Sequence, residues 1–321
     1  MQLMSKIDLT IVLRAFSIFA IVSGHLGFIH LAGGSFYLIF LSGYNFVRFN
    51  YPKVKRANAG KAYFDIVSFV KIYFGFIIKI IVPVLLYTFF IYAFLGRFYL
   101  GGVFLVSNFI GPNYADGLTF WFIEVLVQIY VLFGLVMILN YFYFWISKKP
   151  YQSLLFGFVM FYILSIVCRM IWDTSFYLDR FPHLMMYIFF AGALVAFSTE
   201  TKKKVITSAI LCLIALEFVL FDFNSKVLFL MLGAIATVWV DRISIPKVLH
   251  WPINIIAMSS LFIYLVHFQA KSLIDKLIPN LPAFAVVLFA LLTGIIMSEC
   301  WKRRSKFIQF SKKSFSKGHS K

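Results

Sequence analysis

The sequence is poor in charge and in cysteine. Only 13% of its 321 residues are charged, and 12 acidic residues face 30 lysines and arginines. The three cysteines are isolated from one another, so they form neither a metal-ligand spacing nor a disulfide framework. The glycine-rich patterns of soluble nucleotide-binding proteins, G-x-x-x-x-G-K and G-x-G-x-x-G, are also absent from the sequence. These shortages exclude a disulfide-stapled secreted domain and the common soluble nucleotide-binding enzymes.

Long apolar runs dominate the chain instead. Hydrophobic residues make up 62% of the sequence, and the mean hydropathy is +0.92. Because such a chain cannot expose its surface to water, we predict an all-α, polytopic integral membrane protein. The runs are continuous and do not alternate as barrel strands do. Ten spans are predicted, at 8–30, 34–50, 70–95, 118–141, 152–172, 181–198, 205–222, 226–240, 252–271 and 282–301.

Two details qualify this plan. The third span contains Pro83, where we expect a kink within one helix. An amphipathic lead-in at 61–71 is predicted to lie at the membrane interface before that span. Residues 1–301 are expected to form a single transmembrane domain, followed by a basic cytoplasmic tail at 302–321.

The lysines and arginines give the orientation. With both termini in the cytoplasm, 21 of them fall on inner loops and tails and five on outer loops. This asymmetry satisfies the positive-inside rule at each loop. The basic tail is therefore interpreted as a topology anchor with affinity for anionic membrane lipid. A nucleic-acid partner is not expected, since no folded nucleic-acid-binding module accompanies the charge.

Inside the first span, away from its two end residues, lie two ionisable residues, Arg14 and His25. They are eleven residues apart, which on an α-helix places both side chains on one face, about 16 Å apart along the axis. An ionisable group near the centre of a span costs at least ~2.5 kcal/mol by insertion scales. Both residues are therefore expected to face protein or water and to have a function.

Depth along the spans separates the other polar residues into two groups. Measured at ~1.5 Å per residue from the predicted span ends, His25, Glu124 and His267 all reach the outer half. The inner half collects the cations Arg14, Arg48, Lys71 and Lys79. A polyanionic ligand entering from the cytoplasm would meet these cations. A histidine can then take a proton from a hydroxyl during acyl transfer, with a carboxylate nearby to orient it.

Five segments together resemble the membrane-bound acyltransferase-3 family. The run from Arg14 to His25 is similar to its Arg-x10-His signature, and the other four are similar to its later motifs in the same order. The segments are RAFSIFAIVSGH (14–25), FYLIFLSGY (36–44), FIIKIIVP (76–83), FWFIEVLVQIYVLF (120–133) and SLFIYLVHF (260–268).

The resemblance implies O-acylation, usually O-acetylation, of a carbohydrate hydroxyl at the outer face of a bacterial inner membrane, with acetyl-CoA supplied from the cytoplasm. It implies no metal. His25 matches the family's essential histidine, and Glu124 is the expected carboxylate beside it. The donor is assigned to Arg14, Lys79, Arg48 and Lys71, although Lys79 stands where arginine is usual and lacks its bidentate geometry. The acceptor side is assigned to Trp121, Tyr130, His267, Tyr264 and Ser42.

Structural interpretations compete with each of these assignments. His25 and His267 can serve as hydrogen bonds within the helix bundle, and Arg14 and Lys79 can extend to the inner interface. Glu124 can pair with a neighbouring cation. Ser42 and Gly43 suit close helix packing.

A different class of function is also open. In a secondary transporter or a flippase for a lipid-linked sugar, the same ionisable residues would form a relay. A catalytically inactive relative is a third reading.

The outer loop 96–117 is partly apolar, and we predict that it re-enters and covers the acceptor site, with Asn113, Tyr114 and Asp116 best suited to bind sugar hydroxyls.

Overall fold

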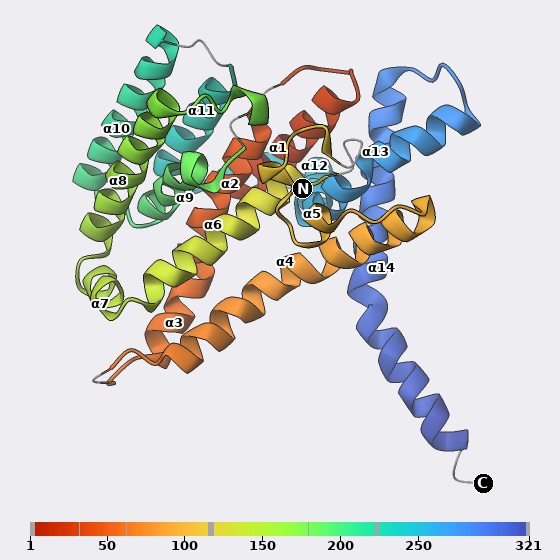
Figure 1. Cartoon of the computed structure of the whole chain (residues 1–321), viewed down its shortest axis with the longest axis horizontal. Coiled ribbons are helices and arrows are strands. Elements are labelled where there is room, and N and C mark those ends of the chain that lie inside the picture. The colour runs from red at the N-terminus through yellow and green to blue at the C-terminus, as the bar shows by residue number, and fades with distance from the viewer. Residues whose placement is uncertain are drawn as a thin grey trace. The chain divides into compact units, whose positions relative to one another are not determined.

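The computed structural model describes residues 4–31, 33–61, 63–114, 119–178, 180–221 and 225–318, with side chains left out at 140–141, 217–228 and 305–318. About 80% of the chain is helical, and sheet is almost absent (Figure 1). The helices are α1 (Leu9–His25), α2 (Gly34–Asn45), α3 (Tyr51–Ala57), α4 (Ile66–Leu95), α5 (Leu100–Val103), α6 (Trp121–Ile138), α7 (Asn140–Lys148), α8 (Pro150–Ile171), α9 (Pro182–Ala196), α10 (Thr201–Phe221), α11 (Ser225–Trp239), α12 (Lys247–Met258), α13 (Ser260–Leu277) and α14 (Ala283–Gly318). Shorter elements are the π-helical turn η1 (Phe46–Asn50), the 3₁₀ turns η2 (Ser107–Phe109) and η4 (Ser175–Tyr177), and the strands β1 (Met4–Asp8) and β2 (Arg242–Pro246).

Apolar helices of membrane-spanning length support the predicted class. Among the described residues, α4, α6, α8 and the Ala283–Arg304 part of α14 are long and apolar enough to cross a bilayer. A fifth span results if the bent pair α12 and α13 is counted as one. Helices α1 and α9 are apolar but shorter. The fold is thus that of an all-α, membrane-embedded protein, whereas the count of ten spans is not confirmed.

The ninth predicted span, 252–271, is divided between two helices. The chain bends by 78° between α12 and α13, and Ser259 lies between the two helices. The hydropathy pattern gave no sign of this bend because both flanks are apolar. Serine pairs are among the recognised causes of sharp kinks, and Ser259 is followed directly by Ser260.

The chain divides into two compact units. The terminal unit combines residues 1–32 with residues 242–321, and the central unit contains residues 33–241. The tail boundary predicted at residue 301 falls inside α14, because this helix continues to Gly318.

A two-stranded antiparallel ribbon joins the two segments of the terminal unit. Strand β1 pairs with β2 in a register that runs from Met4 opposite Pro246 to Asp8 opposite Arg242. The sequence analysis did not foresee this ribbon. Asp8 also begins α1, since its carboxylate accepts hydrogen bonds from the Thr10 backbone N–H at 2.9 Å and the Thr10 hydroxyl at 2.6 Å. The ribbon therefore leads directly into α1 on one strand and α12 on the other.

Close backbone packing holds α2 against α9 in the central unit. A Cβ atom added at Gly43 would overlap the Phe189 carbonyl oxygen, and one added at Gly192 would overlap the Phe40 carbonyl oxygen. Small residues allow this approach, as they do at many helix interfaces in membranes. Gly43 is thus a packing residue, as one of the two interpretations proposed.

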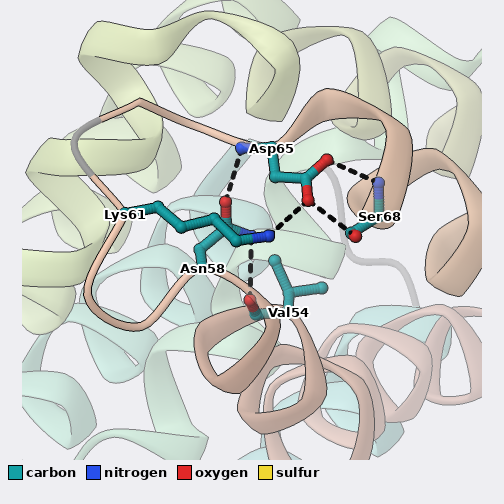
Figure 2. Close-up of polar contacts among 5 residues, drawn as sticks. All are labelled: Val54, Asn58, Lys61, Asp65 and Ser68. Carbon is teal, nitrogen blue, oxygen red and sulfur yellow. Dashed lines mark hydrogen bonds and ion pairs between the residues drawn. The ribbon is translucent and has the colours of Figure 1, made fainter.

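Helix α4 begins at a turn that Figure 2 shows. The predicted lead-in 61–71 is in fact this turn followed by the first residues of α4, which runs as one helix through Pro83. The Asn58 amide donates to the Val54 carbonyl and accepts the Asp65 N–H at 2.6 Å. The Asp65 carboxylate accepts from Lys61 Nζ, from the Ser68 N–H at 2.9 Å and from the Ser68 hydroxyl at 2.8 Å. Asp65 is therefore the N-cap of α4.

We expect the Asp65 cap to make the start of α4 sensitive to pH. The hydrogen bond from Lys61, and then those from Ser68, lower the pKa of the Asp65 carboxyl. A carboxyl with a lowered pKa contributes stability above the ordinary aspartate pKa of about 4, and this contribution is lost as the pH falls toward the lowered value. Replacing Asp65 with alanine should speed hydrogen exchange of the Ser68 amide by roughly fivefold at neutral pH.

The Asp65→Asn variant is the matched control. Asparagine also caps helices, so protection of Ser68 should be largely kept while its dependence on acid pH disappears. A Ser68 protection factor, the exchange rate corrected for the intrinsic pH dependence of amide exchange, that stays constant into acid pH in the wild-type protein would contradict this explanation.

Candidate functional site

His25 is the last residue of α1, and local chain geometry fixes it there. The helix closes with the Phe28 N–H donating to the Ser23 carbonyl at 2.9 Å and the Gly27 N–H donating to the Gly24 carbonyl at 3.4 Å. Gly27 has a φ of 73°, so this is the Schellman ending that favours glycine. Helix α1 therefore stops at His25 and not at residue 30 as predicted. The glycine two residues after His25 is the sequence signal that would have found this end.

This position has an electrostatic consequence. The carboxyl end of a helix carries a partial negative charge, which favours a positively charged histidine by about 0.3–1 kcal/mol. The His25 side chain is also exposed. His25 is thus accessible and lies at the negative end of the α1 dipole.

His25 contacts a second histidine, His267 of α13. The Nδ1 atom of His25 lies 2.9 Å from Nε2 of His267. The ring planes are within 21° of each other and the ring centroids are 5.1 Å apart. The distance between the two ring centroids is about the N–N distance plus the distance from each nitrogen to the centre of its own ring. The two nitrogens therefore lie on the line between the ring centres, and the rings meet edge to edge. His267 itself is only 1% exposed.

Two residues of α13, Tyr264 and Phe268, surround the pair of histidines. Nδ1 of His267 lies 2.6 Å from the Tyr264 carbonyl oxygen, three residues earlier on α13. The Phe268 ring lies 5.2 Å from the His25 ring at an interplanar angle of 15°, and 4.1 Å from the His267 ring. Tyr264, which was predicted to lie on the acceptor side, also contacts His267 through its ring, with the ring centroids 5.6 Å apart.

Arg14 contacts α13 at its first residue. The Arg14 Nε atom donates to the Ser260 hydroxyl at 2.9 Å, next to the bend. The buried Ser259 hydroxyl beside it has no hydrogen-bond partner within the described part of the chain. Arg14 and His25 were expected to share one face of their helix, and both do contact the same helix, α13.

Glu124 of α6 belongs to the central unit and is bonded to a loop. It is 1% exposed, and its two carboxylate oxygens accept the Ser107 hydroxyl at 2.6 and 2.7 Å. The Asn108 N–H donates to the same carboxylate at 3.0 Å. The Asn108 amide group in turn exchanges hydrogen bonds with Gln128 and donates to the Arg180 carbonyl at 2.9 Å. Glu124 therefore anchors residues 107–108 of the preceding loop to α6 through hydrogen bonds, and the described residues place no cation in an ion pair with it, as one interpretation had expected.

We expect Glu124→Gln to loosen this loop without unfolding the protein. A glutamine keeps the size of the side chain but has one acceptor oxygen in place of two. A hydrogen bond to a charged group contributes about 1.5–3 kcal/mol, so exchange of the Asn108 amide should be faster by at least about tenfold. Hydrogen exchange read by mass spectrometry measures this, and Ser107→Ala should give a similar change. An unchanged Asn108 amide would show that Glu124 does not hold the loop.

The loop is more regular than the sequence analysis expected, since it includes α5 and η2. The Tyr114 hydroxyl accepts the Gly101 N–H at 3.0 Å, so this candidate sugar-binding group holds the loop together. Asp116 lies outside the described residues.

The remaining predicted acceptor residues lie in the central unit. The Trp121 ring lies under the Arg180 guanidinium, 4.7 Å from its centroid. Tyr130 is buried, and its hydroxyl donates to the Ser42 carbonyl at 3.5 Å. The Ser42 hydroxyl donates to the Leu38 carbonyl of its own helix at 2.8 Å. Their role in binding an acceptor stays a prediction.

The predicted donor cations other than Arg14 also lie in the central unit. Lys71 and Lys79 are exposed on α4. Arg48 is exposed on η1, with its guanidinium 5.3 Å from the centroid of the Phe49 ring. His25 and Glu124 belong to different units, so the catalytic partnership predicted for them stays a prediction as well.

Comparison with known proteins gave no match to a family model, to a curated protein or to a solved structure. Within the described part of the chain, no group of three or more histidine, cysteine, aspartate or glutamate side chains is placed to hold a metal ion. The site is therefore interpreted from its own residues.

Proposed function

We propose that this protein is a membrane-bound O-acyltransferase that moves an acyl group, in the first instance acetyl, from cytoplasmic acetyl-CoA to a hydroxyl of a surface or lipid-linked carbohydrate. The membrane concerned would be the inner membrane of a bacterium. The observation that carries the proposal is an exposed histidine, His25, at a helix end and in hydrogen-bond contact with the buried His267. This is the arrangement expected of a general base with a second residue to orient it.

The proposed reaction needs one proton carrier. A His25 ring nitrogen takes the proton of the acceptor hydroxyl while the hydroxyl oxygen attacks the thioester carbonyl carbon. The tetrahedral intermediate then collapses, its C–S bond breaks, and the imidazolium returns the proton to the departing thiolate. The products are the acyl ester and free CoA. The negative end of the α1 dipole supports the imidazolium while it carries the proton.

Arg14 supports the donor half of the proposal. Its guanidinium lies beside the first residue of α13, next to the buried hydroxyl of Ser259, which has no hydrogen-bond partner among the described residues. The amino end of a helix together with an arginine suits the phosphate groups of a nucleotide-type donor. Arg14 and His25 are about 16 Å apart along the helix axis, which fits a donor whose charged head and reactive thioester are joined by a long arm. Lys71, Lys79 and Arg48 are proposed to attract the same polyanion.

The proposed acceptor groups are the aromatic residues Trp121, Tyr130 and Tyr264, with Ser42; His267, which was also predicted on the acceptor side, is proposed to orient His25 instead. Aromatic faces pack against the apolar faces of sugar rings, and Trp121 is a half-exposed ring of this kind. Membrane lipid is the remaining partner proposed.

The second candidate function is a proton-coupled transporter or a flippase for a lipid-linked sugar. One observation favours it, namely the 78° break between α12 and α13, because discontinuous helices are typical of transporter binding sites. In this case the His25–His267 pair would relay protons and no acyl group would be transferred.

Two measurements separate these functions. Mass spectrometry of surface glycans from cells with and without the protein should show one acetyl increment that depends on it. The purified protein should also bind acetyl-CoA and release CoA in a reaction that requires His25. Failure to bind acetyl-CoA, combined with proton-driven sugar movement in proteoliposomes, would replace the transferase by the transporter.

A further inference from the structure

We propose that His267 is a positioning residue that holds His25 in one tautomer, with hydrogen on Nδ1 and the basic lone pair on Nε2. The inference deepens the proposed function and rests on it for its catalytic meaning, although the tautomer itself is a property of the resting protein. One end of the chain of hydrogen bonds through His267 and His25 has a fixed direction.

That fixed end is the Tyr264 carbonyl. A carbonyl oxygen only accepts hydrogen bonds, and it lies 2.6 Å from Nδ1 of His267. Nδ1 of His267 must therefore carry the hydrogen. In a neutral imidazole only one nitrogen does so, which leaves Nε2 of His267 as an acceptor.

The direction of the second hydrogen bond follows. Nε2 of His267 lies 2.9 Å from Nδ1 of His25, so Nδ1 of His25 is the donor and carries the hydrogen. The opposite direction would require hydrogen on both nitrogens of His267. That form is a cation, which would be buried at 1% exposure, and the described residues place no carboxylate against it.

The ring geometry supports this hydrogen bond. A nitrogen lone pair lies in the plane of its ring, so an N–H donor must approach in that plane. The two rings lie edge to edge with their planes within 21°, as such a bond requires. Phe268 contacts both rings and limits their rotation, because its ring lies 5.2 Å from the His25 ring and 4.1 Å from the His267 ring.

The consequence for catalysis concerns the other edge of His25. With Nδ1 engaged, Nε2 is the ring nitrogen with a lone pair, and the side chain that carries it is exposed. When Nε2 accepts a proton, the Nδ1–H bond to His267 becomes a charge-assisted hydrogen bond and strengthens. His267 thus does for His25 what a carboxylate does in a serine-hydrolase triad, without adding negative charge.

The direct test is ¹⁵N NMR of histidine-labelled full-length protein in detergent. The His25 resonances are identified by their loss in His25→Ala. The expected result is a protonated Nδ1 and a non-protonated Nε2 in the wild-type protein near pH 8. A non-protonated Nδ1 would overturn the proposal, and this reading requires no substitution at His267.

Two variants test the positioning role. His267→Leu removes the acceptor at similar volume and should lose the Nδ1–H preference, with kcat about 100-fold lower and the KM for acetyl-CoA little changed. His267→Gln returns an acceptor oxygen and should recover most of the Nδ1–H preference of His25 and most of the wild-type kcat. An unchanged His25 tautomer in His267→Leu would overturn the proposal.

The two proposals fail separately. If the wild-type tautomer is as expected and depends on position 267, but acetyl-CoA is never consumed, the proposed function is wrong while His267 still positions His25. If acyl transfer requires His25 but is indifferent to His267→Leu, the positioning role is wrong and the transferase stands.

Discussion

Replacing His25 with alanine is expected to lower acceptor-dependent release of CoA by about 10²–10⁴-fold, the contribution of a general base. The fold should survive, because the side chain is exposed at a helix end and its removal leaves no internal cavity. CoA release is followed by a thiol reagent, and the acetylated acceptor by its mass. The melting temperature of the variant in detergent checks that the protein is intact.

A matched control lies five residues further along the chain. His30 is also an exposed histidine but lies beyond the end of α1. His30→Ala should retain wild-type turnover. Equal activity of the His25 and His30 variants would remove the basis of the transferase mechanism, and equal inactivity would place the effect in the segment after α1 and not in the His25 ring.

The largest loss of stability is expected from Gly192→Ala and Gly43→Ala. In each case the new Cβ atom would overlap a backbone carbonyl oxygen of the facing helix, and backbone cannot rotate away as a side chain can. Overpacking usually costs about 1–3 kcal/mol, and we expect the upper end or beyond here, so that α2 and α9 separate. Both variants should express poorly or unfold at markedly lower temperature.

Gly75→Ala provides the control for this pair. Gly75 lies within α4, and no atom lies within 4 Å of the position its Cβ would take. Since alanine is the better helix former, this variant should be unchanged or more stable by up to about 1 kcal/mol. Heating can be followed by labelling of the buried Cys168 after the exposed Cys212 and Cys300 are replaced by serine. Gly192→Ala with wild-type stability would contradict the close packing of α2 and α9.

Much of the fold could be predicted from the sequence because hydropathy and loop charge act over whole segments. The class of protein and the presence of a helix within each predicted span follow from these averages. The averages do not register single residues that redirect the chain. Gly27 ends α1 early, and Ser259 separates α12 from α13, although the apolar pattern continues through both. The ribbon was missed because five-residue strands far apart in the sequence give no pattern of their own.

The candidate site was predictable to a similar extent. The spacing of Arg14 and His25 is a local property of one helix, so their common face could be read from the sequence. The contact of His25 with His267 joins residues 242 positions apart, and no periodicity encodes such a pairing. For Glu124, the sequence suggested a chemical role that its hydrogen bonds do not indicate. Its depth suggested chemistry, but its hydrogen-bond partners Ser107 and Asn108 lie in a loop whose course the sequence leaves open.

The ribbon between β1 and β2 has a consequence for biogenesis. It joins the beginning of the chain to a segment that the ribosome makes more than 200 residues later, and His267 follows later still. Helix α1 is therefore made before its partners, and neither the ribbon nor the contact with the second histidine can form until residues 242–267 have been translated. A chain that ends between residues 25 and 267 contains Arg14 and His25 but lacks the histidine that orients the base. Under the proposed function, incomplete chains would then be unable to consume acetyl-CoA in a reaction that requires an oriented His25.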